Sequence, residues 1–109
     1  MFRIDKGRVF IYRDTSFGAA IRPKIMIDEQ AIGTSVAKGF SYSDRAPGQH
    51  VVSLTTEWKH KDTVTVVRGH PSFVRSHVTM GAFVGHVIPT AVSSAEAEGE
   101  IQNCKLVTD

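Results

Sequence analysis

The sequence contains almost no cysteine. Of its 109 residues, one is cysteine, Cys104. A single cysteine excludes an intramolecular disulfide and a cysteine-based zinc site. Cys104 and Leu106 are two residues apart, so their side chains would lie on the same face if residues 104–107 form a strand. Because free cysteine behaves as a small apolar residue, we expect Cys104 to be buried on a strand rather than to act as a reactive thiol.

Long hydrophobic runs are also missing. No segment approaches the roughly 20 consecutive apolar residues that span a bilayer. The first seven residues include Arg3, Asp5 and Lys6, and they are too polar for the apolar region of a signal peptide. We therefore expect a soluble chain.

Charge of one sign is scarce as well. Thirteen Lys and Arg residues stand against eleven Asp and Glu residues, which leaves a net charge of +2. Basic residues such as Arg8, Arg13 and Lys59 are interleaved with aromatics such as Phe10 and Trp58, as in oligonucleotide-binding barrels. Because nucleic-acid affinity depends on a concentrated positive charge, this small excess predicts no nucleic-acid partner.

The length and composition indicate a globular protein with one core. Apolar residues make up 41% of the chain and charged residues 22%, which is not the composition of a disordered or fibrous protein. A chain of this size forms one sizeable core. We expect a single domain over residues 1–109, with its ordered core at about residues 7–108. We expect no cofactor, because the chain is too short for most cofactor-carrying α/β enzymes.

What the sequence does contain is a series of short β-type segments. They are rich in β-branched and aromatic residues, and turn formers such as Pro47-Gly48 separate them. Pro89 predicts either the end of a strand or an edge position. Strands in this rhythm favour an all-β, antiparallel sandwich of about 7–9 strands. The predicted strands are residues 8–13, 24–28, 31–34, 40–43, 50–57, 63–67, 72–78, 83–88 and 104–107.

One late segment departs from the strand pattern. Residues 93–102 are rich in helix formers, and Ser93 and Glu96 have the spacing of a capping box. Gly99 costs about 1 kcal/mol relative to alanine inside a helix, so we expect a short helix. Its glutamates are expected to form a solvated face.

The sequence contains no recognisable catalytic or metal motif. Its five histidines, at positions 50, 60, 70, 77 and 86, form no H-E-x-x-H pattern, and no G-x-S-x-G segment is present. His60 and His70 fall in predicted connections, where we expect them to be solvated. His77 and His86 flank one predicted hairpin and are the remaining metal candidates, but structural zinc requires about four ligands. We therefore predict no metal site and no catalytic residues.

Several apolar residues lie in predicted connections between strands. Loops on a rigid sandwich often carry binding function. The alternative is that these loops fold back and close the ends of the core, since scattered apolar residues are normal on a surface. The candidate binding residues are Phe17, Ile21, Trp58, Met80 and Phe83.

The order of several segments resembles a known bacterial family. These are residues 9–13, 27–33, 47–50, 78–81 and 104–107. They are similar to small envelope lipoproteins that are catalogued as a domain of unknown function, and the Pro-Gly-x-His turn is similar to that of PEGA-type surface-layer domains. The resemblance implies a β-sandwich at a periplasmic or outer-membrane-associated location. It also implies membrane contact through an N-terminal lipid-bearing cysteine alone, which this chain does not contain, and it supplies no catalytic residues.

Three hypotheses of function follow. The first is a non-enzymatic binding or scaffold module of the bacterial cell envelope, whose partner is a protein or another envelope component. The second is an inhibitor or immunity protein that binds a toxin or hydrolase through the loops at Phe17–Ile21 or Met80–Phe83. The third is a metal protein or weak enzyme built on His77 and His86.

Overall fold

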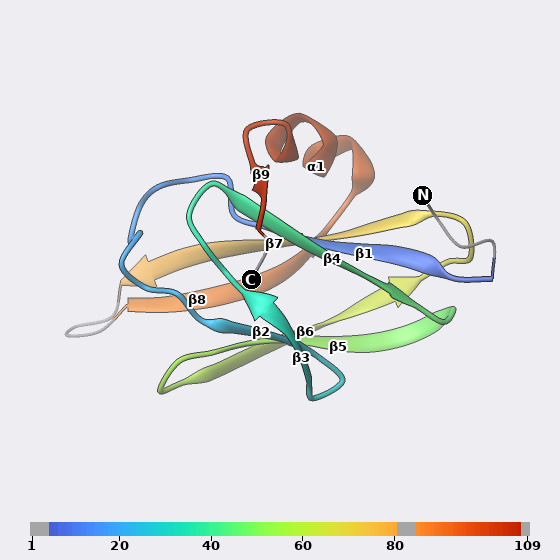
Figure 1. Cartoon of the computed structure of the whole chain (residues 1–109), viewed down its shortest axis with the longest axis horizontal. Coiled ribbons are helices and arrows are strands. Elements are labelled where there is room, and N and C mark those ends of the chain that lie inside the picture. The colour runs from blue at the N-terminus through green and yellow to red at the C-terminus, as the bar shows by residue number, and fades with distance from the viewer. Residues whose placement is uncertain (1–4, 81–84, 108–109) are drawn as a thin grey trace.

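Two β-sheets packed face to face form the body of the protein (Figure 1). The computed structural model describes residues 5–80 and 85–107, which form nine strands and one helix. The first sheet has the order β8 (Gly85–Val92), β7 (Pro71–Met80), β1 (Gly7–Tyr12), β4 (Gly39–Arg45) and β9 (Lys105–Leu106). The second has the order β3 (Gln30–Thr34), β2 (Lys24–Ile27), β5 (Gly48–Thr55) and β6 (Lys59–Val66). The predicted all-β sandwich is therefore confirmed.

The strand pairings are mostly antiparallel. Among the described residues, five pairings are antiparallel, whereas β1 with β7 and β4 with β9 are parallel. The parallel pairings arise because the chain passes between the sheets: β4 leads into β5 of the other sheet, and β6 leads back into β7. Neighbours within the first sheet are therefore far apart in sequence, and a hairpin does not set their direction.

The core lies between the two sheets. Alternate residues of the strands point inward, as the period of two requires. The buried side chains are Val9, Ile11, Ile25, Ile27, Val52, Leu54, Val64, Val66, Val74 and Val87. All except Leu54 are β-branched, which explains both why these segments form strands and why they pack well. Each such side chain contributes about 1.5–3 kcal/mol through its burial.

The helix covers part of the outer face of the first sheet. Helix α1 (Ser94–Ile101) packs its Ala97 with Tyr12 and Phe73 in a second apolar cluster. The Ser93 side chain accepts a hydrogen bond from the backbone N–H of Glu96, which confirms the predicted cap. Within the described residues, no helix is long and apolar enough to cross a membrane.

The turns explain how neighbouring strands are placed. Asp28 and Glu29, with φ of 51° and 67°, form the two-residue turn between β2 and β3, as expected for a hairpin with positive φ at both central positions. Gly48 has a positive φ of 128°. It begins β5, and the connection before it joins β4 of the first sheet to β5 of the second, so it is not the turn of a hairpin. Pro89 lies within β8, an edge strand, where its missing N–H costs no ladder bond.

One predicted connection is in fact strand. Residues 59–62 were expected to form a polar connector, but they pair with residues 52–55 as the start of β6. The polarity of these residues reflects an edge strand rather than a loop. The turn itself is shorter and consists of residues 56–58.

Asp62 joins the free edges of the two sheets. One of its carboxylate oxygens accepts the backbone N–H of Thr63 at 2.9 Å, and the other accepts that of Ala91, on β8, at 2.8 Å. The Ser72 hydroxyl donates to the carbonyl of Thr65, also on β6, at 2.9 Å. These bonds satisfy edge groups that could otherwise pair with another chain.

Replacement of Asp62 by alanine tests this arrangement. We expect Asp62→Ala to lower the free energy of unfolding by about 1–2 kcal/mol, because two strand-edge N–H groups lose their acceptor. We also expect stronger self-association, since both edges become free to pair. Urea unfolding and analytical ultracentrifugation measure the two effects. Thr63→Ala, which keeps the carboxylate, is the control, and equal behaviour of the two variants would contradict the role of Asp62.

Candidate functional site

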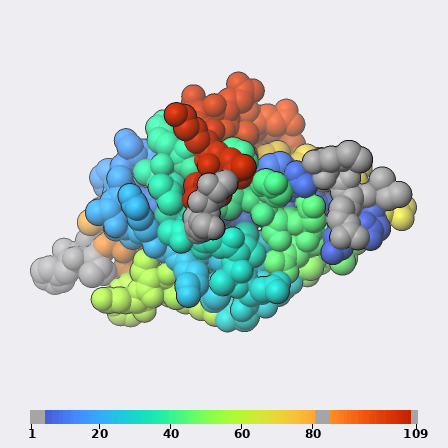
Figure 2. Space-filling model, in the orientation of Figure 1, coloured from blue at the N-terminus to red at the C-terminus, as the bar shows by residue number. Residues whose placement is uncertain are grey.

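Two connections and the ends of two strands lie at one end of the sandwich. They are residues 13–23 between β1 and β2, the β5–β6 turn, the last residues of β7 and the first residues of β8, all on the left in Figure 1. Met80, which the sequence places in a connection, is the last residue of β7. Figure 2 shows the blue loop and the yellow-green turn at this same end. Phe17, Trp58 and Met80 are 59%, 51% and 59% exposed. We call Phe17, Ile21, Trp58 and Met80 the apolar end.

Close contacts hold the apolar end together. Ile21, Trp58 and Gly85 line a shallow hollow of about 230 Å³. A Cβ atom at Gly85 would lie 2.4 Å from Ile21 Cδ1 and 3.1 Å from Met80 Sδ. A side chain at this position would therefore require the ends of the Ile21 and Met80 side chains to move. Of the five residues predicted for binding, Ile21, Trp58 and Met80 come together around Gly85. Phe17 lies in the same connection as Ile21, and Phe83 lies outside the described residues.

A buried arginine fixes the loop that carries Phe17 and Ile21. Arg13 is 1% exposed, and its guanidinium donates to the carbonyls of Gly18 and Ile21, both at 2.7 Å, and of Ser35 at 3.2 Å. Burial, with the nearby charge of Arg22, lowers the pKa of Arg13. The rigid fork of the guanidinium suits several carbonyls at once, so Arg13 positions the loop.

Two of the basic residues considered for nucleic acid make contacts within the fold. Arg13 is buried within the fold. Arg8 instead lies over the Tyr42 ring at 4.1 Å and donates to the Asp44 carboxylate at 2.8 Å. The Asp44 carboxylate raises the pKa of Arg8. These two positive charges are therefore engaged within the fold.

Two histidines from different sheets meet beside Trp58. His60 Nε2 lies 2.9 Å from His86 Nδ1, and the two rings are 5.0 Å apart at an angle of 79°. The centre of the Trp58 ring is 5.9 Å from that of His86. The pair expected from the sequence, His77 and His86, does not form this contact, because His77 pairs with Ile88 and His86 with Thr79 in the register.

His60 is not the solvated turn residue that the sequence predicted. It is half-buried on β6, whose residues 59–62 were mistaken for a connector. His70 does lie exposed in the turn before β7, as expected. His50 is placed elsewhere, beside the Asp28 carboxylate, and this neighbour lowers the pKa of Asp28.

Cys104 is half-buried next to the second apolar cluster. Its thiol donates to the carbonyl of Arg13 at 3.5 Å, and burial raises its pKa. A raised pKa keeps the sulfur in the unreactive thiol form at neutral pH. The residue directly precedes β9 rather than lying within a strand.

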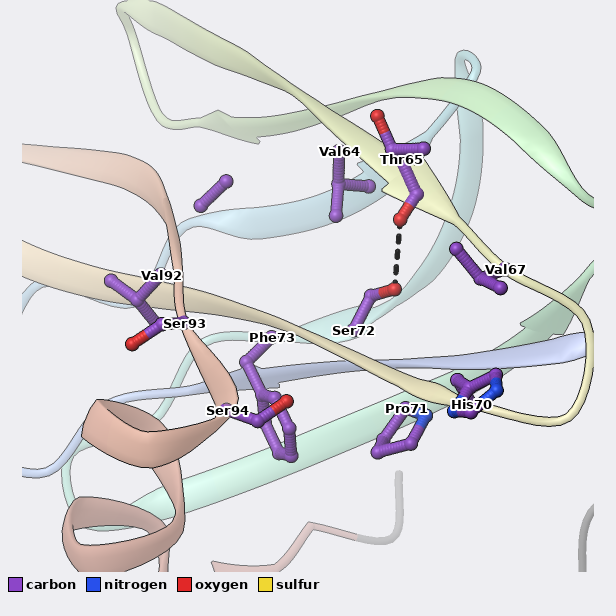
Figure 3. A pocket seen from close by; sticks show the side chains of 11 residues that line it. Val64, Thr65, Val67, His70, Pro71, Ser72, Phe73, Val92, Ser93 and Ser94 are labelled. Carbon is purple, nitrogen blue, oxygen red and sulfur yellow. Dashed lines mark hydrogen bonds between the residues drawn. The ribbon is translucent and has the colours of Figure 1, made fainter.

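A second hollow lies between β6, β7 and the start of α1 (Figure 3). It has a volume of about 470 Å³. Val64, Phe73 and Val92 form apolar walls, and the described residues that line it include no Asp, Glu, Lys or Arg. Two of its hydroxyls are already used, since Ser72 donates to Thr65 and Ser93 caps the helix. His70 and Ser94 are the other polar side chains that line it, besides Thr65.

The described part of the chain contains no metal site with three or more side-chain ligands. Within residues 5–80 and 85–107, no three or more His, Cys, Asp or Glu side chains gather in a way that could hold a metal ion. The apolar end, with its adjacent histidine pair, is therefore the strongest candidate site. Its chemistry is that of contact through large apolar side chains.

Comparison with known proteins places the chain in a family. A family model described as "Protein of unknown function (DUF2846)" matches residues 3–87. An uncharacterized protein of Haemophilus influenzae (strain ATCC 51907 / DSM 11121 / KW20 / Rd) is 30% identical over 105 residues, which cover 94% of this chain and 62% of that protein. The chain thus spans less than two thirds of this relative's length. Because the family model matches more than half of the chain, the chain belongs to the DUF2846 family of proteins of unknown function.

Proposed function

We propose that the protein is a non-enzymatic binding module of the bacterial cell envelope and that its apolar end contacts a protein partner. The observation that carries this proposal is the exposure of Phe17, Trp58 and Met80, from two connections and the end of β7, at one end of the sandwich. Large aromatic side chains and methionine are enriched in protein interfaces, and a few of them usually supply most of the binding energy.

The rigidity of the apolar end supports a binding role. Arg13 holds the loop of residues 17–21 through the carbonyls of Gly18 and Ile21, and the absence of a side chain at Gly85 lets Ile21 and Met80 pack closely. A surface that is already ordered loses little conformational entropy when a partner binds. The exposed apolar area is therefore available for recognition rather than for closing the core.

The position of the apolar end favours a protein over a lipid surface. Trp58 directly precedes β6. The last residue of β6, Val66, lies beside Gly7, the first residue of β1, because a Cβ atom at Gly7 would be 2.6 Å from Val66 Cγ1. An eight-residue strand spans about 26 Å. If the domain is part of a lipoprotein anchored at its N-terminal side, as the family resemblance implies, its apolar end points away from the membrane.

An inhibitor or immunity protein would use the same end. The feature that favours this second candidate is the fixed loop bearing the exposed Phe17, since inhibitors commonly bind through pre-organised loops. The two candidates differ in what the partner does. A captured enzyme whose activity falls when the protein binds would support the inhibitor, and an unaffected partner would support the scaffold module.

Truncation of Trp58 tests the proposal. We expect Trp58→Ala to weaken capture of the envelope partner by about 30-fold, because loss of a central aromatic anchor costs about 2 kcal/mol. The measurement is quantitative crosslinking of the tagged full chain in envelope fractions. Val67→Ala is the matched control, because Val67 is also 51% exposed but lies at the opposite end. Equal loss in both variants, or in neither, would rule out the apolar end as the contact surface.

A further inference from the structure

We propose that His60 and His86 form a two-nitrogen site for a divalent transition-metal ion, with Cu²⁺ preferred. Imidazole nitrogen is a common ligand for late first-row metals. The two ring nitrogens that face each other, His60 Nε2 and His86 Nδ1, are 2.9 Å apart. The proposal is independent of the partner-binding function, because it requires only these two side chains.

The sequence did not reveal this pair because the two residues are 26 positions apart. His60 lies on β6 and His86 on β8, the adjoining edge strands of the two sheets. Asp62 already joins the same two strands through the backbone N–H of Ala91. The approach of the two imidazoles therefore follows from a fixed contact between the sheets rather than from a flexible loop.

The affinity order of the metals favours copper. The 2.9 Å between the facing nitrogens is the length of a hydrogen bond in the metal-free pair, and it shows that the two imidazoles lie close enough to share one ion. Cu²⁺ heads the affinity order of divalent first-row metals for a given nitrogen site. With no third side-chain ligand gathered among the described residues, water completes the coordination.

Metal binding requires a defined rearrangement of one proton. In the metal-free pair, one facing nitrogen donates its hydrogen to the other, so only one of them offers a lone pair. When the metal binds, that hydrogen moves to the outer nitrogen of the same ring, and both facing nitrogens become ligands. Both rings must also turn so that their lone pairs converge beside the line joining the nitrogens, which the broad χ2 torsion of histidine permits.

Trp58 provides a direct reporter of this site. It is the only tryptophan of the chain, and its ring centre lies 5.9 Å from that of His86. Bound Cu²⁺ quenches indole fluorescence at such short range. We expect titration of the full chain with CuCl₂, in buffer containing glycine as a weak competitor, to quench Trp58 and to saturate at one equivalent. We expect the electron paramagnetic resonance spectrum to show coupling to two imidazole nitrogens.

Matched variants decide the result. His60→Gln and His86→Gln keep hydrogen-bonding groups but remove the imidazole ligand, and we expect each to weaken Cu²⁺ binding at least tenfold. His70→Gln, in the exposed turn before β7, should bind as the parent does. Circular dichroism melts of all variants confirm that they are folded. Unchanged quenching in folded His86→Gln, or tighter binding of Zn²⁺ than of Cu²⁺ in competition, would overturn the proposal.

Discussion

Replacement of Arg13 by methionine is expected to lower the free energy of unfolding by about 3–4 kcal/mol. Methionine fills much of the same volume but donates no hydrogen bonds, so the carbonyls of Gly18, Ile21 and Ser35 lose their common donor. Each buried acceptor left without a partner costs about 1–3 kcal/mol, and the total is limited because the exposed loop can turn its carbonyls to water. For a domain of this size, the melting temperature should fall by about 12 °C or more.

The same change should also alter the apolar end. Once residues 17–21 are released, Ile21 leaves the hollow beside Trp58, and we expect the Trp58 emission to shift to the red before global unfolding. Urea titration followed by fluorescence and by circular dichroism separates the two events. Arg22→Met, at an exposed arginine of the same connection, should change stability by no more than about 0.5 kcal/mol. A loss in Arg13→Met no larger than that of Arg22→Met would contradict the role assigned to the guanidinium.

Replacement of Glu100 by glutamine is expected to cost about 2 kcal/mol at neutral pH and much less in acid. Glu100 accepts a hydrogen bond from the Tyr12 hydroxyl and pairs with Arg75, which also binds Glu96. The bond from Tyr12, followed by that from Arg75, lowers the pKa of Glu100. These contacts connect the helix to β1 and β7, so their loss weakens the docking of the helix.

The pH dependence follows from the direction of the shift. Because the pKa of Glu100 is lower in the folded than in the unfolded protein, its stabilising effect is complete above the unfolded value. It is lost as the pH falls through the folded value. We therefore expect the stabilities of the parent and of Glu100→Gln to converge as the pH falls below about 4. Burial, with the Glu100 carboxylate, raises the pKa of Tyr12, so its hydroxyl remains a donor throughout.

The measurement is urea unfolding at pH 7 and at pH 3.5. Glu98→Gln is the control on the same helix, because Glu98 is exposed, and it should change stability by no more than about 0.5 kcal/mol at either pH. A constant difference between the parent and Glu100→Gln across this range would show that the carboxylate charge does not contribute to helix docking.

Local features of the fold were predictable from neighbouring residues. The β-branched segments became strands, Ser93 caps the helix as its spacing to Glu96 indicated, and Pro89 lies on an edge strand. The main local error, residues 59–62, has a clear cause. Polar residues on an edge strand resemble a connector in sequence, and only their pairing with β5 shows that they belong to β6.

The candidate site was predicted only in part. The apolar character of Phe17, Ile21, Trp58 and Met80 indicated binding residues, but their placement at one end depends on how two distant connections and the end of β7 are arranged. The histidine pair was assigned to the wrong hairpin partner. His86 contacts His60 across the edge between sheets rather than His77 within its own sheet, and no sequence spacing encodes that contact.

By itself the sequence determined most of the segments that extend, apart from residues 59–62, most of the turns, and that the strands enclose an apolar core. These properties depend on residues within a few positions of one another. Only the tertiary structure decided that β1 pairs with β7 in parallel, that Arg13 is buried as the support of a loop, and that His60 meets His86. The reason is physical: these contacts join groups brought together by the packing of two sheets, and packing depends on the shape of the whole core.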